Sequence, residues 1–238
     1  MPMRIAVLGA TGGVGNHVVR LALEQGHTVM ALARDPSKIT ATGQKLEKAS
    51  FDASSPTAAG DLEAGIKGSD MVLSCLGNKR GEETIVERGT ATLLAAMASS
   101  GVPRMAMVSS IGVGDSSWQL YRLGFGGWVF SAIFATLLRR TKYDLTAAEQ
   151  LCIGSPAGWV YSAAPHARPG GVSCVVVRPA GLSNAPGEGK YDVALADGTV
   201  GASVAREDVA RFMLTLVADQ KYDNGAVSVG GNAPRTGH

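Results

Sequence analysis

Short apolar runs alternate with segments of helical periodicity along most of the chain. Residues 5–8 are continuously apolar, which is typical of a strand covered on both faces. Residues 14–25 then repeat apolar positions at helical spacing, and Gly26 ends the pattern. This alternation predicts an α/β fold, a doubly wound and mostly parallel sheet with helices on both faces. Further strands are expected at 28–33, 45–51, 71–76, 105–108, 172–177 and 226–229, and further helices at 61–67, 83–100, 143–153 and 206–218.

The alternation fails in two places. The region 112–141 contains an uncharged apolar stretch at 123–138, which is shorter than the roughly 20 residues of a membrane-spanning helix. A lid, a substrate wall or a subunit contact is favoured there over a membrane span. Residues 154–171 are rich in Gly, Pro, Ala and Ser and predict a surface loop. Some side chains of this loop could reach a binding site, although surface decoration is favoured: Trp159, Tyr161 and His166.

Composition narrows the class of protein. With 238 residues, 45% of them hydrophobic and 18% charged, the chain can fill one core, so we expect a single domain over 1–238. A net charge of +2 without a basic run argues against a nucleic-acid partner. Three distant cysteines and four scattered histidines lack metal-ligand spacing, so we expect no metal and a reducing compartment. The first strand leaves no room for a signal peptide. We expect a cytoplasmic protein, a monomer or homodimer, without a membrane partner.

The first predicted strand and helix are joined by a glycine-rich turn, Gly9-Ala10-Thr11-Gly12-Gly13-Val14-Gly15. Glycine permits a tight turn and lets the backbone approach a pyrophosphate, whose charge is met by free N–H groups and the helix dipole. The spacing G-x-x-G-x-x-G differs from the usual G-x-G-x-x-G fingerprint, and a plain turn would also explain an isolated motif. Here the strand, turn, helix and second strand fall in register, which favours a dinucleotide-binding Rossmann fold.

The residues after the second strand bear on which dinucleotide binds. Sites for NAD usually place a carboxylate there, whereas sites for NADP place an arginine near the 2′-phosphate. This strand ends at Ala33 and is followed by Arg34, with Lys38 four residues further on. A guanidinium offers planar, bidentate contact to phosphate, so NADP(H) is favoured over NAD(H). The alternative left open is that Arg34 pairs with Asp35 at a solvated turn.

The other cofactor contacts are expected where parallel strands end, because ligands of open sheets lie across the carboxyl ends of the strands. The third strand ends near the adenine, the fourth near the ribose and pyrophosphate, the fifth near the nicotinamide, and the sixth beside them. The corresponding residues are Asp52 and Ala53, then Leu76, Gly77 and Asn78, then Ser109 and Ser110, and finally Pro179, Ala180 and Gly181.

These residues, with several further motifs, give the chain a resemblance that covers most of its length. It resembles the atypical short-chain dehydrogenase/reductases, and among them the NmrA-like and biliverdin-IXβ (flavin) reductase group. The resemblance implies NADP(H) binding and, where activity exists, reduction of flavins, quinones or linear tetrapyrroles. The motifs that carry it are the glycine turn, Ala33-Arg34-Asp35, Leu76-Gly77, Val108-Ser109-Ser110, Arg178-Pro179-Ala180-Gly181, Gly189-Lys190-Tyr191 and Arg206-Glu207-Asp208-Val209-Ala210.

The chain departs from the family in its catalytic residues. Short-chain dehydrogenases with carbonyl chemistry use a tyrosine with a lysine four residues later, and no tyrosine here has that partner. The candidates for catalysis are therefore Ser109 and Ser110, with Tyr143 and Glu149 on the following helix. Glu149 corresponds to a position where the biliverdin-reductase branch has a histidine. It could donate a proton only if burial raised its pKa, and a solvent-facing carboxylate is the alternative.

The leading hypothesis is an NADPH-dependent reductase that transfers hydride to a small planar acceptor. Such a transfer mainly needs two flat rings at close distance, so the missing tyrosine–lysine pair does not prevent it. Aromatic side chains in 112–141 would suit a flat acceptor, although core packing also accounts for several of them. The alternative is a non-catalytic NADP(H)-binding sensor or regulator. An isomerase that retains its nicotinamide is a weaker third possibility.

Overall fold

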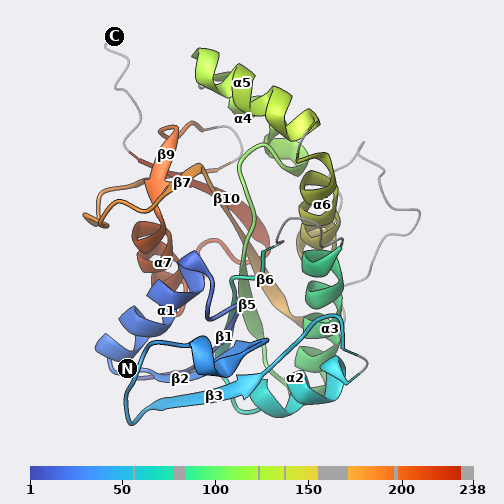
Figure 1. Cartoon of the computed structure of the whole chain (residues 1–238), viewed down its shortest axis with the longest axis vertical. Coiled ribbons are helices and arrows are strands. Elements are labelled where there is room, and N and C mark those ends of the chain that lie inside the picture. Colours follow the sequence, from blue (N-terminus) through green and yellow to red (C-terminus); the bar gives the residue numbers. More distant parts are fainter. Residues whose placement is uncertain are drawn as a thin grey trace.

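The apolar runs form one sheet of eight strands in the order β3-β2-β1-β4-β5-β6-β10-β8 in the computed structural model (Figure 1). All neighbours pair in parallel except β8, which runs antiparallel to β10. The structure describes residues 1–55, 57–77, 84–122, 124–136, 138–154, 171–195 and 198–231. The strands are β1 Arg4–Leu8, β2 Thr28–Ala33, β3 Leu46–Ser50, β4 Met71–Ser74, β5 Arg104–Val108, β6 Ser173–Pro179, β8 Asp192–Ala194 and β10 Gly225–Gly230.

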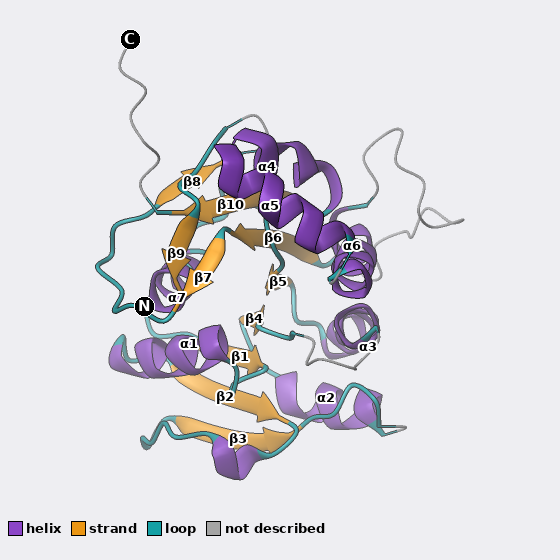
Figure 2. Ribbon diagram, turned by 45° about the horizontal axis from the view of Figure 1, so that its top comes forward, coloured by secondary structure: helices purple, strands orange, loops and turns teal. Residues whose placement is uncertain are grey.

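Helices cover both faces of this sheet. Figure 2 shows α1 and α7 on one side, with α2, α3 and α6 on the other. The strand order reverses between β1 and β4, which is the switch point where open sheets of this kind bind ligands. The predicted fold class is therefore confirmed. The helices are α1 Gly13–Glu24, α2 Ala58–Ile66, α3 Ile85–Ser100, α6 Arg139–Ile153 and α7 Arg206–Thr215.

The first strand explains why its sequence is continuously apolar. Its side chains point alternately to the two faces of the sheet. Ile5 and Val7 pack with α1 and α7 in one apolar layer, whereas Ala6 and Leu8 pack in the layer beneath α2 and α3. All four side chains are fully buried. Because side chains on both faces of this strand pack in apolar layers, the strand has no polar positions alternating with apolar ones.

Several element boundaries differ from expectation, and those of α6 and β6 have clear physical reasons. Helix α6 begins at Arg139, one turn before the predicted start at residue 143. The sequence pattern missed this first turn because it is polar and shows no apolar period. Strand β6 continues through Pro179, which was expected to stop it. Proline is tolerated there because Pro179 is the last residue of the strand, and its carbonyl oxygen accepts a hydrogen bond from the N–H of Ile111.

The irregular region 112–141 forms short helices between β5 and α6. Its elements are η2 Gly114–Trp118, α4 Gln119–Arg122 and α5 Gly124–Ala135. In Figure 1, α4 and α5 lie at the opposite end of the molecule from β3. Among the described helices, none is both long and apolar enough to cross a bilayer.

Three further short elements escaped the sequence pattern. Strands β7 Gly181–Ser183 and β9 Ser203–Ala205 pair in parallel as a separate small sheet, and η1 Pro36–Lys38 follows β2. The predicted surface loop, with Trp159, Tyr161 and His166, falls on 155–170, outside the described residues.

Candidate functional site

The glycine turn is folded tightly against the end of β4. Gly9 has a φ of +73°, and a Cβ atom there would lie 2.5 Å from the carbonyl oxygen of Cys75. The N–H of Gly12 donates to the carbonyl oxygen of Gly9 at 2.8 Å. A Cβ at Gly15 would collide with that same oxygen. Glycine is therefore required at positions 9 and 15 by contacts within the protein, before any ligand is considered.

A pocket of about 260 Å³ lies beside this turn, at the N-terminus of α1. Gly12 is the N-cap of the helix, and none of its capping contacts among the described residues comes from a side chain. The first N–H groups of α1 are thus available to an anion, which the helix dipole also favours. The residues that line the pocket are Thr11, Gly12, Gly13, Asn16, His17, Lys38, Thr40, Asn184 and Arg206.

Arg206 is a site residue that the sequence pointed to only as part of a family motif. Its side chain crosses the turn, so that a Cβ at Gly13 would lie 2.6 Å from its Cδ atom. Its Nη1 atom donates to Oδ1 of Asn184 at 2.7 Å. Because α7 packs against α1, the first residue of α7 comes to the N-terminus of α1. The guanidinium is therefore held beside the place where an anion would bind.

The cations after β2 lie at the same edge of the sheet. Lys38 lines the pocket and pairs with Asp35 at 3.0 Å, and its side chain is 73% exposed. Arg34 is exposed as well. Hydrogen bonds from Ser54 lower the pKa of Asp52, and the charge of Arg34 lowers it further. The charge of Arg34 thus acts on Asp52, where the adenine is expected.

Other strand-end residues contribute mainly packing and backbone contacts. Ala53 is buried, and Leu76 packs against the same apolar layer. The N–H groups of Ala180 and Gly181 already donate to backbone carbonyl oxygens, of Val229 and Ala202. These two N–H groups are therefore not available to a ligand. Gly77 ends a described range, and Asn78 lies outside the described residues.

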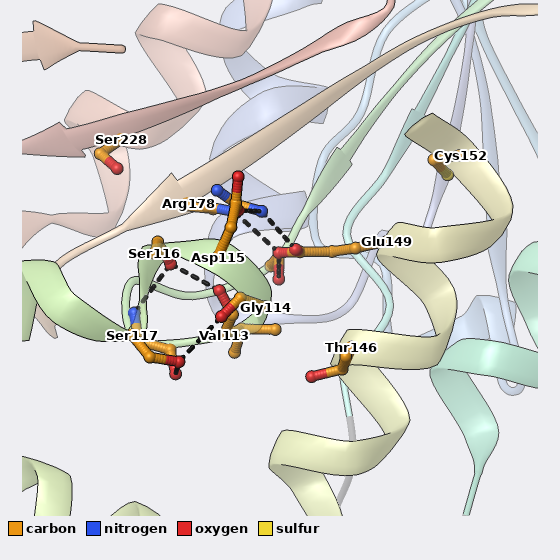
Figure 3. A network of polar contacts seen from close by, with 12 residues as sticks. Val113, Gly114, Asp115, Ser116, Ser117, Thr146, Glu149, Cys152, Arg178 and Ser228 are labelled. Carbon is orange, nitrogen blue, oxygen red and sulfur yellow. Dashed lines mark hydrogen bonds and ion pairs between the residues drawn. The ribbon is translucent and has the colours of Figure 1, made fainter. Parts of the chain in front are cut away.

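A buried polar network joins the ends of β5 and β6 to α6 (Figure 3). The Ser109 hydroxyl donates to Oε1 of Glu149 at 2.5 Å. Arg178 donates two hydrogen bonds to the same carboxylate, from Nε to Oε1 at 3.0 Å and from Nη2 to Oε2 at 2.6 Å. All three residues are at most 6% exposed. The structure thus brings Ser109 and Glu149 together and rejects the alternative of a solvent-facing Glu149.

Asp115 adds a second carboxylate to this network. Its Oδ1 atom lies 2.6 Å from Nη2 of Arg178, and its side chain is one-third exposed. Element η2 holds it there, because the hydroxyl of Ser116 donates to the carbonyl oxygen of Val113 and fixes the turn. Gly114 permits this close approach, since a Cβ there would lie 2.9 Å from Oε2 of Glu149. One guanidinium therefore serves two carboxylates.

The charges of this network are set by opposing effects. Burial raises the pKa of the Glu149 carboxyl group, while hydrogen bonds from Arg178 and Ser109 act to lower it. Burial alone would lower the pKa of Arg178, but the hydrogen bond and charge of Glu149 raise it overall. Arg178 consequently remains a cation. A bidentate ion pair is the arrangement that these side chains form, with Ser109 directed at Glu149.

The other two candidates for catalysis lie apart from this network. Ser110 donates its hydroxyl proton to the adjacent carbonyl oxygen of Ile111 at 3.1 Å. Tyr143 is 50% exposed in the first part of α6, and the guanidinium carbon of Arg139 lies 6.0 Å from the centre of its ring. Sequence reasoning missed the roles of Arg178 and Asp115. A charged residue at the end of the apolar run 174–177 was the available signal for Arg178.

Comparisons with known proteins agree with this geometry. A family model described as NAD(P)H-binding matches residues 9–220. An uncharacterised protein of Mycobacterium tuberculosis is 34% identical over 108 residues, which cover 45% of this chain but only 12% of that protein. The matched stretch is therefore a small part of the mycobacterial relative.

Solved structures share the fold over nearly the whole chain. The anaerobilin reductase ChuY of Escherichia coli O157:H7 aligns with a TM-score of 0.71 and 20% identity, covering 98% of this chain and all of that one. A wide-type short-chain dehydrogenase/reductase of Veillonella parvula, solved in complex with NADP, aligns with a TM-score of 0.70 and 18% identity. That alignment covers 100% of this chain and 98% of the other.

Proposed function

Because the chain belongs to the NAD(P)H-binding family, we propose that it is an NADPH-dependent reductase that transfers hydride to a small planar acceptor. The family match confirms the nucleotide-binding resemblance found in the sequence, and the solved neighbours share the fold. The observation that carries the proposal is the buried network of Ser109, Glu149 and Arg178 at the same edge of the sheet as the glycine turn. The acceptors expected are flavins, quinones and linear tetrapyrroles.

The glycine turn would hold the pyrophosphate of the cofactor. Thr11, Gly12 and Gly13 line the pocket, and Arg206 lies beside them as a counter-charge. An uncapped helix N-terminus with an adjacent guanidinium is the arrangement that a diphosphate needs. The neighbouring residues Gly9, Val14 and Gly15 would shape the turn rather than touch the ligand.

The remaining cofactor contacts follow from the strand ends. Arg34 and Lys38 would bind the 2′-phosphate, which favours NADP(H), and the solved NADP complex of the Veillonella neighbour supports this choice. The adenine would lie near Asp52 and Ala53. The ribose and nicotinamide would follow along the next strand ends, beside Leu76, Gly77, Asn78, Ser109, Pro179, Ala180 and Gly181.

At the nicotinamide end, Ser109 has a defined polarity. Its proton is directed to Glu149, so its free lone pairs can accept a hydrogen bond from the carboxamide of the cofactor. Arg178 holds Glu149 in place and thereby fixes the Ser109 hydroxyl. NADPH, when bound, supplies the hydride. Ser109 would orient the nicotinamide ring that carries this hydride. The rate of transfer depends on how closely the ring is held in the reactive geometry.

The absence of a tyrosine–lysine pair agrees with an acceptor that is planar and conjugated. Hydride addition to a simple ketone creates a localised alkoxide, which requires a neighbouring acid. Addition to a flavin or quinone spreads the negative charge over the ring, and water can then supply the proton. Near Ser109, the hydroxyls of Ser110 and Ser116 already donate to backbone carbonyl oxygens, so the delocalised acceptor is the better match.

A titration with NADPH and NADH, followed by absorbance at the nicotinamide band with riboflavin and a small quinone present, tests this function. We expect NADPH to bind more tightly than NADH and to be consumed when an acceptor is added. Ser109→Ala should lower the rate by at least about tenfold while leaving the affinity for NADPH nearly unchanged. Failure to bind either nucleotide would overturn the proposal.

One observation favours a second candidate, an NADP(H)-binding sensor without turnover. Both oxygens of Glu149 are engaged by Arg178, so the only buried carboxylate near the nicotinamide in the described part of the chain is not free to exchange protons with a substrate. A sensor would bind NADPH tightly and show no consumption with any acceptor. The same titration therefore separates the two functions.

A further inference from the structure

Helix α5 is apolar around its whole circumference yet too short to cross a membrane. Its sequence is GFGGWVFSAIFA, and Ser131 is the one residue in it with a polar side chain. Twelve residues rise about 18 Å, compared with a bilayer core of about 30 Å. Apolar helices of this length are usually buried in a core or lie at a membrane interface.

Exposure of its side chains shows that α5 is not a core helix. Trp128 is 63% exposed and Val129 is 44% exposed, and Tyr121 packs edge-on against Trp128 with ring centres 5.1 Å apart. Leu138 is also exposed just beyond the helix. Five of the eight exposed large apolar or aromatic side chains of the described residues fall between 121 and 143. They gather at one end of the molecule, on α4, α5 and the start of α6 (Figure 1).

The charge of this end is also distinctive. Residues 116–143 contain four basic residues, Arg122, Arg139, Arg140 and Lys142, and no acidic residue. The whole chain has 22 basic and 20 acidic residues, so acidic residues are in excess outside this segment. Arg139 and Arg140 are exposed directly after the apolar stretch. An excess of positive charge thus lies beside the exposed apolar side chains of this segment.

We propose that α5 and its flanks, residues 121–143, dock on an anionic membrane surface. Aromatic side chains at the edge of an apolar helix, with cations beside them, match the headgroup region of a bilayer. Basic residues near such a surface are attracted by anionic lipids. The helix would lie in the interface and not span it. This revises the expectation of no membrane partner.

Charge argues against a second copy of the chain as the occupant of this face. A two-fold dimer through α5 would bring the same patch together from both subunits, since such an interface is self-complementary. The basic residues of both copies would then face one another, since the segment 116–143 contains no acidic residue. The proposal does not depend on catalysis, because the docking residues lie outside the polar network around Glu149.

Flotation of the full chain with lipid vesicles tests the docking. Vesicles of phosphatidylcholine with about one-third phosphatidylglycerol should carry the protein, whereas pure phosphatidylcholine should carry little, and binding to the anionic vesicles should fall as salt is raised. Replacing Arg139 and Arg140 by glutamine should weaken binding about thirtyfold. Trp128→Ala should weaken it at least about tenfold. Lys67→Gln with Arg88→Gln, exposed cations on α2 and α3, is the matched control and should bind as the wild type does.

Three outcomes would overturn the proposal. One is no flotation with either vesicle. Another is equal flotation with both vesicles, unaffected by salt or by the arginine substitutions. The third is a dimer in sedimentation velocity that Trp128→Ala dissociates, without vesicle binding, which would make the face a subunit interface. Unchanged NADPH affinity in every variant would show that the fold is intact and that failure here leaves the proposed function untouched.

Discussion

Replacement of Arg178 by methionine tests the buried ion pair with Glu149, which holds the Ser109 hydroxyl in place. Methionine keeps much of the side-chain length but removes the charge and both hydrogen bonds to Glu149. Arg178 is 2% exposed and Glu149 is 3% exposed, so water cannot take the place of the lost guanidinium. Removing one partner of such a pair costs about 3–5 kcal/mol. For a chain of this size, the melting temperature should fall by roughly 6–20 °C.

The loss should depend on pH in a defined direction. Burial already raises the pKa of Glu149, and without Arg178 that rise is opposed by Ser109 alone. A carboxyl group with a raised pKa in the folded state favours folding below its unfolded pKa of about 4.3, and this contribution is lost as the pH rises through the folded pKa. The variant should therefore lie close to the wild type near pH 4.5 and fall furthest behind at pH 8. Urea unfolding at the two pH values measures the difference.

A double variant separates charge from packing. Glu149→Gln combined with Arg178→Met leaves no uncompensated buried charge, because Asp115 is partly exposed and can be solvated. It should recover most of the stability at pH 8 and lose the pH dependence. Full stability of Arg178→Met at pH 8, or a loss equal at both pH values, would refute the ion pair as the feature that holds Ser109 in place.

Four further predictions concern the cofactor half of the site. Arg206→Gln should weaken NADPH and NADH alike by roughly tenfold in calorimetry, because the pyrophosphate is common to both; an effect on NADPH alone would reassign Arg206 to the 2′-phosphate. Arg34→Glu should weaken NADPH about a hundredfold and NADH little, and equal losses would contradict the 2′-phosphate assignment. Gly12→Leu should abolish binding of both nucleotides; its φ of −74° suits any residue, but a Cβ there lies 3.1 Å from the Gly9 carbonyl oxygen, so the melting temperature is measured alongside, and retained affinity would make the turn purely structural. Gly9→Ala should instead lower the melting temperature, because a Cβ there meets the Cys75 carbonyl at a positive φ; unchanged stability would contradict that contact.

The sheet could be predicted from sequence because its strands are buried on both faces. The run 29–33 is apolar throughout and buried, and it lies within β2 at Thr28–Ala33. Glycine and proline mark the ends of several elements independently of tertiary contacts, as Gly101 does after α3. Local signals of this kind suffice where every residue of an element faces a core.

Elements without such signals were not found. Strand β8 is half-buried throughout and only three residues long, so it has no measurable period. Helix α5 is apolar on every side, and periodicity cannot separate a buried helix from a strand or an interfacial segment. Their positions follow from contacts with residues distant in the sequence, which no local pattern contains.

For Glu149, the burial of the side chain could be predicted from the sequence, but its partner could not. Leu145, Ala148 and Cys152 lie on the same side of α6 by helical spacing, and all are buried, so Glu149 belongs to an apolar stripe. That stripe could have excluded a solvent-facing carboxylate. What the carboxylate does there depends on Arg178, on another element and 29 residues away, which sequence spacing does not reveal.

The two ends of the site rest on different physical foundations. The turn proposed for the pyrophosphate is made of backbone and of glycines fixed by contacts with Cys75 and with the turn itself. The network of Ser109, Glu149 and Arg178 is made of side chains that hydrogen-bond to one another, so each side chain restricts the positions of the other two. Because Arg178 binds both oxygens of Glu149, the Ser109 proton has one partner in the described network, the Glu149 carboxylate. A reductase of delocalised acceptors needs no more than this orientation, whereas alcohol–ketone chemistry would need a free acid that the ion pair has consumed.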